Sequence, residues 1–79
     1  MGRNAQLIRQ WAILKHIEST RWSTIPDLAD RHYVSTKTIR RDLAALMEAG
    51  FPLYDERYEG KVYWRLAEDY KGLPLANLS

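Results

Sequence analysis

With 79 residues the chain makes one small domain with a single hydrophobic core, and without cysteine it has neither a disulfide framework nor a thiolate metal site. No apolar run approaches the length of a membrane span and the N-terminus lacks the apolar core of a signal peptide, so we expect a cytoplasmic protein with no membrane partner. The net charge is only +2, but residues 1–41 hold eight of the twelve basic residues and three of the ten acidic ones, a distribution compatible with a nucleic-acid partner.

Residues 4–19 have the apolar periodicity of an amphipathic helix. Leu7, Trp11 and Leu14 are spaced i, i+4 and i+7, so we expect them to share one face and to pack in the core. Ile13 projects well away from this face. We interpret it as an incidental exposed apolar residue, with a contact to a second subunit or a further domain as the alternative.

A second, short helix is predicted to begin at Thr24. Thr24 has the side chain of an N-cap, and Pro26 follows in the first turn, where its missing N–H costs nothing. This helix must end near His32, because the chain then leads directly into the cap of the next helix. The glycine that is usual in such a turn is absent, so we expect His32 or Tyr33 to take its position.

The stretch with the most information is a basic, amphipathic helix over about residues 35–49. Ser35 is the predicted N-cap, and Gly50 supplies the stop. Ile39 and Leu43 lie on an apolar stripe that faces the core, whereas the opposite side is cationic and hydroxylic near the N-terminal end. The helix dipole favours acidic residues in a first turn, so early basic residues indicate a polyanionic neighbour. The outward candidates are Ser35, Thr36, Lys37, Thr38, Arg40 and Arg41.

Two helices joined by a tight turn, with basic residues on the outward side of the second, are typical of the helix-turn-helix unit. We therefore predict sequence-specific binding of double-stranded DNA, with the helix of residues 35–49 in the major groove. Thr36, Lys37 and Arg41 are predicted to approach base edges. The predicted phosphate contacts are Ser35, Thr38 and Arg40.

After Gly50 the apolar period changes to that of β-strands. Val62, Trp64 and Leu66 alternate along a second strand and are expected to face the helices, and Gly60 allows the positive φ of a tight turn. A two-stranded hairpin is marginal alone, so it must lie against the helices. The predicted fold is thus mainly α with a small β-hairpin, a winged helix-turn-helix of three helices plus the wing.

The expected wing tip holds two cations among acidic neighbours. Arg57 and Lys61 are candidate DNA-binding residues that could reach the phosphate backbone or the adjacent minor groove. Because three acidic residues cluster beside them, contact of the wing tip with DNA is left open. Tyr58 and Tyr63 are expected on the outward side of the wing. The aromatic residues expected in the core are Trp11, Trp22, Phe51 and Trp64.

Several blocks of the sequence resemble the N-terminal winged helix of bacterial WYL-domain transcriptional regulators. Residues 24–29, 34–46, 50–53 and 63–66 carry the resemblance, which covers about residues 4–68. The most specific block reads Ser-x-x-Thr-Ile-Arg-Arg-Asp-Leu and is followed by Gly-Phe-Pro. Sugar-operon repressors of the DeoR type share the middle block, whereas Gly-Phe-Pro favours the WYL group.

The resemblance implies the DNA-binding module of a bacterial transcription regulator. Because helix-turn-helix proteins usually bind paired half-sites about one helical turn apart, we expect the full-length protein to be a homodimer. Residues 1–68 would be the winged helix, and residues 69–79 a linker to a C-terminal domain that senses an effector and is absent from this chain. The family pattern implies that Asp42 braces the third helix within the domain. Lys37 stands where an arginine is common, which keeps the charge but gives up bidentate hydrogen bonding.

The sequence gives little indication of catalysis or of metal or cofactor binding. His16 and His32 lie in different elements without a cysteine partner, so we expect structural roles for both and neither a catalytic nor a metal-binding residue. A domain this small, filled by Leu, Ile and Trp, can hardly provide an enzyme's pocket, and no cofactor is expected. The alternative to DNA binding is a winged helix for protein interaction or scaffolding, whose basic face is only solvated.

Overall fold

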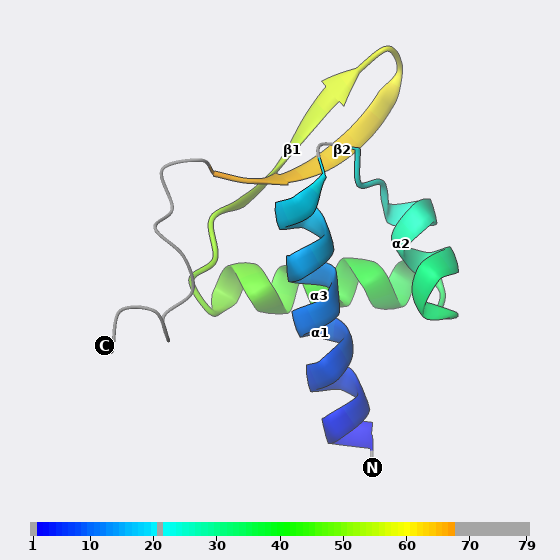
Figure 1. The fold of residues 1–79 in the computed structure, drawn as a ribbon, viewed down its shortest axis with the longest axis vertical. Coiled ribbons are helices and arrows are strands. Elements are labelled where there is room, and N and C mark those ends of the chain that lie inside the picture. Colours follow the sequence, from blue (N-terminus) through cyan, green and yellow to red (C-terminus); the bar gives the residue numbers. More distant parts are fainter. Residues whose placement is uncertain (1, 21, 68–79) are drawn as a thin grey trace.

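The structure is a computed structural model that describes residues 2–20 and 22–67. The predicted fold, mainly α with a small β-hairpin, is confirmed over these residues (Figure 1). The expected linker, residues 69–79, lies outside them. The elements follow in the order α1 (Gly2–Ser19), α2 (Ile25–His32), α3 (Thr36–Glu48), β1 (Leu53–Tyr58) and β2 (Lys61–Leu66).

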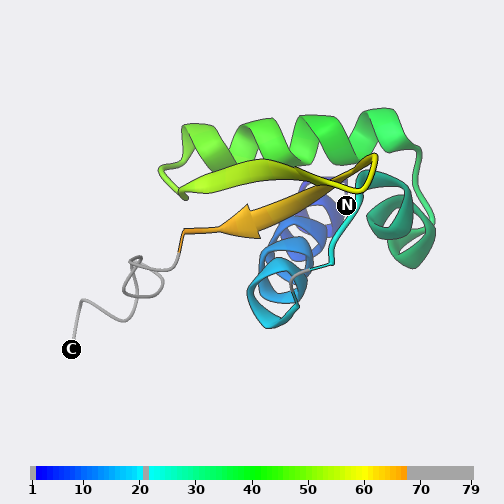
Figure 2. The same ribbon diagram turned by 90° about the horizontal axis from the view of Figure 1, so that it is seen from above.

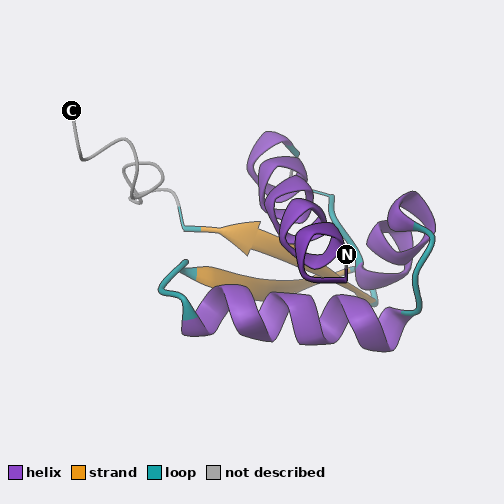
Figure 3. Ribbon diagram, turned by 90° about the horizontal axis from the view of Figure 1, so that it is seen from below, coloured by secondary structure: helices purple, strands orange, loops and turns teal. Residues whose placement is uncertain are grey.

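The core lies where α1 crosses α3, with α2 and the root of the hairpin packed against the crossing (Figure 1). Viewed along the other axis, the antiparallel strands β1 and β2 lie on the same side of α3 as α1 (Figures 2 and 3). One side of α3 is therefore covered and the opposite side is open. The buried apolar residues are Ile13, Leu14, Ile17, Leu28, Ala29, Ile39, Leu43, Leu46 and Leu53.

The predicted core face of α1 is wrong in its N-terminal half. Leu14 is buried, but Leu7 and Trp11 are 57% and 38% exposed, whereas Ile13, expected at the surface, is completely buried. The reason is that α1 extends past α3 at its N-terminal end, so only its C-terminal half is covered (Figure 1). There Ile13, Leu14 and Ile17 form the core face, at a spacing of i, i+1 and i+4 that also fits one side of a helix.

The turn between α2 and α3 is closed by a tyrosine in a conformation that favours glycine. Tyr33 has φ 56° and ψ 42°, which confirms one of the two residues predicted to replace the turn glycine. Its N–H donates to the carbonyl of Asp30 at 3.4 Å, and the N–H of Val34 donates to the carbonyl of Ala29 at 3.1 Å. These two hydrogen bonds make a Schellman motif at the end of α2, so that only three residues separate α2 from α3.

We expect Tyr33→Gly to raise the free energy of unfolding by about 0.5–1 kcal/mol. A residue with a side chain in the left-handed region costs about 1–2 kcal/mol, and glycine removes this cost. Roughly half of the gain is lost again, because glycine raises the conformational entropy of the unfolded chain. Tyr33 is 94% exposed, so little packing is lost. Urea denaturation measures the change, and Tyr33→Ala, which truncates the side chain without relieving φ, serves as the matched control. Equal stability of the two variants would contradict the backbone explanation.

The end of α3 and the hairpin turn also follow the predicted glycines. Gly50 has φ 108°, and its N–H donates to the carbonyl of Met47 while the N–H of Phe51 donates to that of Leu46, so Gly50 ends the helix in a second Schellman motif. In the hairpin, Gly60 has φ 81° as predicted, and Glu59 before it has φ 50°. Two successive positive φ values are those of a type I′ turn, which matches the twist of the strands.

The hairpin is attached to the helices through one of its two faces. Leu53 and Leu66 are cross-strand partners at its root, and with Trp64 they pack in or against the core, as predicted for β2. The backbone N–H of Trp64 also donates to the carbonyl of Ser23 at 2.7 Å, so the segment before α2 pairs with β2 at one point. Glu56 and Tyr63 occupy the other face of the hairpin.

Candidate nucleic-acid interface

The candidate interface begins at the N-cap of α3. Ser35 has extended backbone angles, and its Oγ accepts a hydrogen bond from the N–H of Thr38 at 3.2 Å, which confirms the predicted cap. The two hydroxyl groups also share a hydrogen bond at 3.1 Å. The remaining N–H groups of the first turn have no intrahelical partner, as at the start of any α-helix. This end of α3 therefore presents donors to an anion.

Four of the predicted residues lie together on exposed positions of α3. Its buried residues, Ile39 and Leu43 among them, take one side of the helix. Lys37 and Arg41 are four residues apart and point away from that side, with Ala44 beyond them on the same row. The residues of α3 that are exposed and cationic or hydroxylic are Thr36, Lys37, Arg40 and Arg41.

The cations of this surface have no acidic partner within the part of the chain that the structure describes. The ion pairs there use Arg9, Arg31 and Arg65 as cations. None of them includes a basic residue of α3, and the first turn of α3 contains no acidic residue. The positive charge of α3 therefore adds to that of the helix N-terminus rather than being neutralised within the fold.

Behind this surface, Asp42 anchors α3 to α1. Its side chain is 1% exposed and accepts hydrogen bonds from both Nε and Nη2 of Arg9, the latter at 3.0 Å, and from Nε2 of Gln10 at 3.1 Å. The hydrogen bond to Asp42 raises the pKa of the Arg9 guanidinium, although partial burial acts in the opposite direction. The brace implied for Asp42 is thus present, and its partners on α1 had no signal in the sequence.

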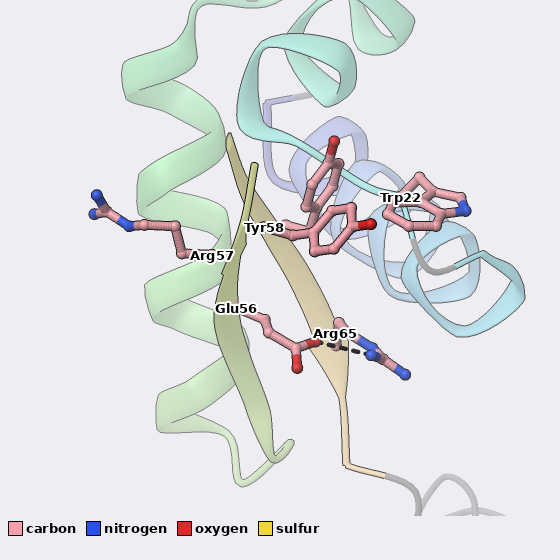
Figure 4. Close-up of a pocket in the computed structure, with 6 residues that line it drawn as sticks. Trp22, Glu56, Arg57, Tyr58 and Arg65 are labelled. Atoms are coloured by element: carbon pink, nitrogen blue, oxygen red, sulfur yellow. Dashed lines mark hydrogen bonds and ion pairs between the residues drawn. The ribbon is translucent and has the colours of Figure 1, made fainter. Parts of the chain in front are cut away.

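The two predicted wing residues are not brought together. Arg57 is the cross-strand partner of Val62 and shares its face of the hairpin with Leu53, whereas Lys61 is the partner of Tyr58 on the opposite face. Figure 4 shows the Arg57 side chain pointing away from Trp22 and Tyr58. Because successive residues of a strand face opposite sides, a two-residue turn cannot place positions 57 and 61 on one face. Only Arg57 lies on the side of the hairpin that faces the core.

An aromatic cluster covers the outer face of the wing. Trp22 is 56% exposed, so its predicted place in the core is wrong. Its ring lies 5.1 Å from that of Tyr63, edge to face, and 5.9 Å from that of Tyr58 (Figure 4). Tyr58 is half-exposed on this outward face, as predicted. Beside the cluster, Arg65 donates to Glu56 across the strands at 2.8 Å.

The two histidines lie near the contact between α1 and α2. Burial is the main cause that lowers the pKa of both His16 and His32, and the neighbouring cations Arg31 and Arg9, respectively, act in the same direction. Both shifts favour the neutral form of the imidazole. Over residues 2–20 and 22–67, the structure contains no cluster of three His, Cys, Asp or Glu residues suited to a metal ion. No helix in these ranges has the length and apolarity needed to cross a membrane.

Comparison with known protein families places the chain in a described family. The family model of the DeoR-like helix-turn-helix domain matches residues 9–54, which is more than half of the chain. No curated protein and no solved structure matches the chain significantly. The matched region contains α2, the turn and all of α3, and it stops before the wing tip. The match therefore bears on the basic surface of α3 and not on Arg57 or Lys61.

Proposed function

The chain belongs to the DeoR-like helix-turn-helix family, and from this premise we propose that it binds specific sequences of double-stranded DNA through α3 as part of a transcription regulator. One observation carries the proposal: Lys37, Arg40 and Arg41 are exposed in the first two turns of α3, and none of them forms an ion pair with a described residue. Both α1 and the hairpin lie on the opposite side of α3 (Figure 3), so the cationic side is open to a groove.

We assign different tasks to the residues of this surface. Lys37 and Arg41 reach base edges in the major groove, where arginine reads guanine through two hydrogen bonds. Thr36 lies beside them, and Ala44 leaves room for the groove wall. The phosphate contacts come from the helix N-terminus together with Ser35, Thr38 and Arg40. Arg57 is the wing residue that we place on the flanking backbone.

An NMR titration tests the proposal against the alternative of a scaffold domain. A duplex of about two helical turns is first selected from a random library by its affinity for the chain. Its addition is expected to shift the amide signals of residues 35–45, while those of residues 13–19 at the C-terminal end of α1 serve as internal controls. The logarithm of the binding constant should fall linearly with that of the salt concentration, with a slope of about −0.9 per phosphate held. Unchanged signals in α3 would favour the scaffold alternative.

We further propose that the chain is the N-terminal, cytoplasmic module of a bacterial WYL-domain regulator. The support is the Gly50-Phe51-Pro52 block, which resembles that group and which here has a structural task. Gly50 ends α3, Phe51 closes the Schellman motif, and the carbonyl of Pro52 accepts a hydrogen bond from Ala67 at 3.0 Å. The block thus sets where the wing leaves the recognition helix. Any effector would be bound by another domain of such a regulator.

We also propose that the full-length regulator is a homodimer in which the exposed end of α1 contributes to the contact. Leu7, Ile8 and Trp11 are 57%, 69% and 38% exposed. The exposed positions of α1 from Asn4 to Ala12 carry no charge, so a two-fold contact of this face with itself opposes no like charges. The face lies at the end of the domain opposite the wing (Figure 1), which leaves α3 free.

Sedimentation of the isolated chain tests this contact. We expect a weak association, with an average mass that rises toward that of a dimer as the concentration approaches the millimolar range. Ile8→Glu should abolish the rise, because two-fold symmetry places the new carboxylates close together. Gln6→Glu, which adds the same charge on another side of α1, is the matched control. If both variants sediment like the parent chain at every concentration, the α1 face is not the dimer contact.

A further inference from the structure

The wing, strands β1 and β2, is attached to the rest of the domain at two positions along its length. At its root, Leu53 is buried in the core and Leu66 packs against it. Farther along, Trp64 is joined to Ser23 through the backbone hydrogen bond of 2.7 Å, and Ser23 is completely buried. The last two residue pairs before the turn, in contrast, consist of half-buried or exposed residues. A two-stranded ribbon of this kind has little rigidity of its own.

Trp22 is the residue that reaches this outer part of the wing. Its ring contacts Tyr58, the last residue of β1, and Tyr63, which lies on β2. More than half of its surface is exposed, so its place is not explained by burial in the core. Trp22 also stands two residues before Thr24, the N-cap of α2. The contact therefore links the outer half of the wing directly to the start of the helix-turn-helix.

Arg57 lies next to Tyr58 and on the opposite face of the hairpin (Figure 4). When Tyr58 is held against Trp22 on one face, the backbone of Arg57 is held as well, and its side chain is directed to the other face. We propose that Trp22 is a positioning residue for DNA recognition: it fixes the angle of the wing to the helix-turn-helix and thereby places Arg57 on the backbone beside the groove that α3 enters. The inference rests on the proposed DNA binding.

The free protein provides the first test. In Trp22→Ala we expect the NMR order parameters of the amides of residues 57–60 to fall from about 0.85 to below 0.6, while those of α3 stay unchanged. Trp22→Phe keeps a ring at this position and should restore the values. Tyr54→Ala, which removes an exposed aromatic residue from the same face of the hairpin without touching the Trp22 contacts, is the control. Unchanged order in Trp22→Ala would overturn the positioning role, whether or not the protein binds DNA.

The second test couples the two residues through DNA binding. Trp22→Ala and Arg57→Ala should each lower the salt dependence of binding to the selected duplex by about one phosphate contact. In the double variant the loss should equal that of Arg57→Ala alone, because Trp22 acts through Arg57. If Trp22→Ala lowered the salt dependence of binding by the same amount in the parent chain and in the Arg57→Ala variant, the proposal would be overturned. Failure of the parent chain to bind any duplex would refute the proposed function instead, and the order parameters would still decide the role of Trp22.

Discussion

Asp42→Ala is expected to lower the free energy of unfolding by about 2–3 kcal/mol, a large part of the total stability of a domain of this size. Asp42 is buried and accepts two hydrogen bonds from Arg9 and one from Gln10. Its removal leaves the guanidinium of Arg9 without a partner in a part-buried position. Because Arg9 keeps 19% of its side-chain surface in solvent, the loss should lie below the 3–5 kcal/mol of a fully buried pair.

Urea denaturation followed by circular dichroism measures this effect. Asp30→Ala is the matched control, since Asp30 is exposed on α2 and its side chain has no hydrogen bond to a described residue. Its stability should change by less than about 0.5 kcal/mol. If Asp42→Ala were equally mild, the contact between α1 and α3 would depend on the apolar core alone, and the brace would have no energetic role.

The parts of the fold that depend only on residues close together in the sequence could be predicted. The cap at Ser35 and the glycines at 50 and 60 each act within a few residues, and the structure places all three as expected. The basic side of α3 follows from the same local periodicity. The left-handed residue between α2 and α3 could be narrowed to two positions because the turn is short, and Tyr33 takes it.

The core face of α1 could not be predicted in the same way. Leu7, Trp11 and Leu14 make as good an apolar stripe as Ile13, Leu14 and Ile17, so the periodicity of the helix allows both. The choice depends on which turns of α1 meet α3, and that is a property of the tertiary structure. Leu7 and Trp11, which the periodicity predicts in the core, lie on an exposed face instead.

The contacts that tie the interface together join residues that are distant in the sequence. Arg9 and Asp42 are 33 positions apart, and no local spacing connects them. The general burial of large aromatic residues predicts Trp22 in the core, yet its partners lie on a face of the hairpin that only the strand register defines. The same register separates Arg57 from Lys61, which follow each other closely in the sequence but face opposite sides.

Arg41→Ala is expected to weaken binding to the selected duplex by about 1–3 kcal/mol, roughly a 5- to 150-fold rise in Kd. Arg41 is exposed on the outward side of α3 and has no ion pair with a described residue, so its guanidinium is free for bidentate contact with a base. Fluorescence anisotropy at fixed salt gives the Kd. Lys15→Ala removes an equal charge from an exposed position on α1 and should change the Kd far less.

The same measurement on a set of single-base variants of the duplex separates reading from positioning. In the parent chain, each base substitution at a contacted position should raise the Kd. In Arg41→Ala this rise should disappear at one base pair and persist at the others, because loss of a base contact relaxes specificity only where that contact was made. Arg40→Ala should instead weaken binding to every duplex by a similar factor and lower the salt slope by about one, as expected for a phosphate contact. If Arg41→Ala behaved like Arg40→Ala, α3 would hold the backbone at both positions, and the base contacts would have to come from Lys37 and Thr36.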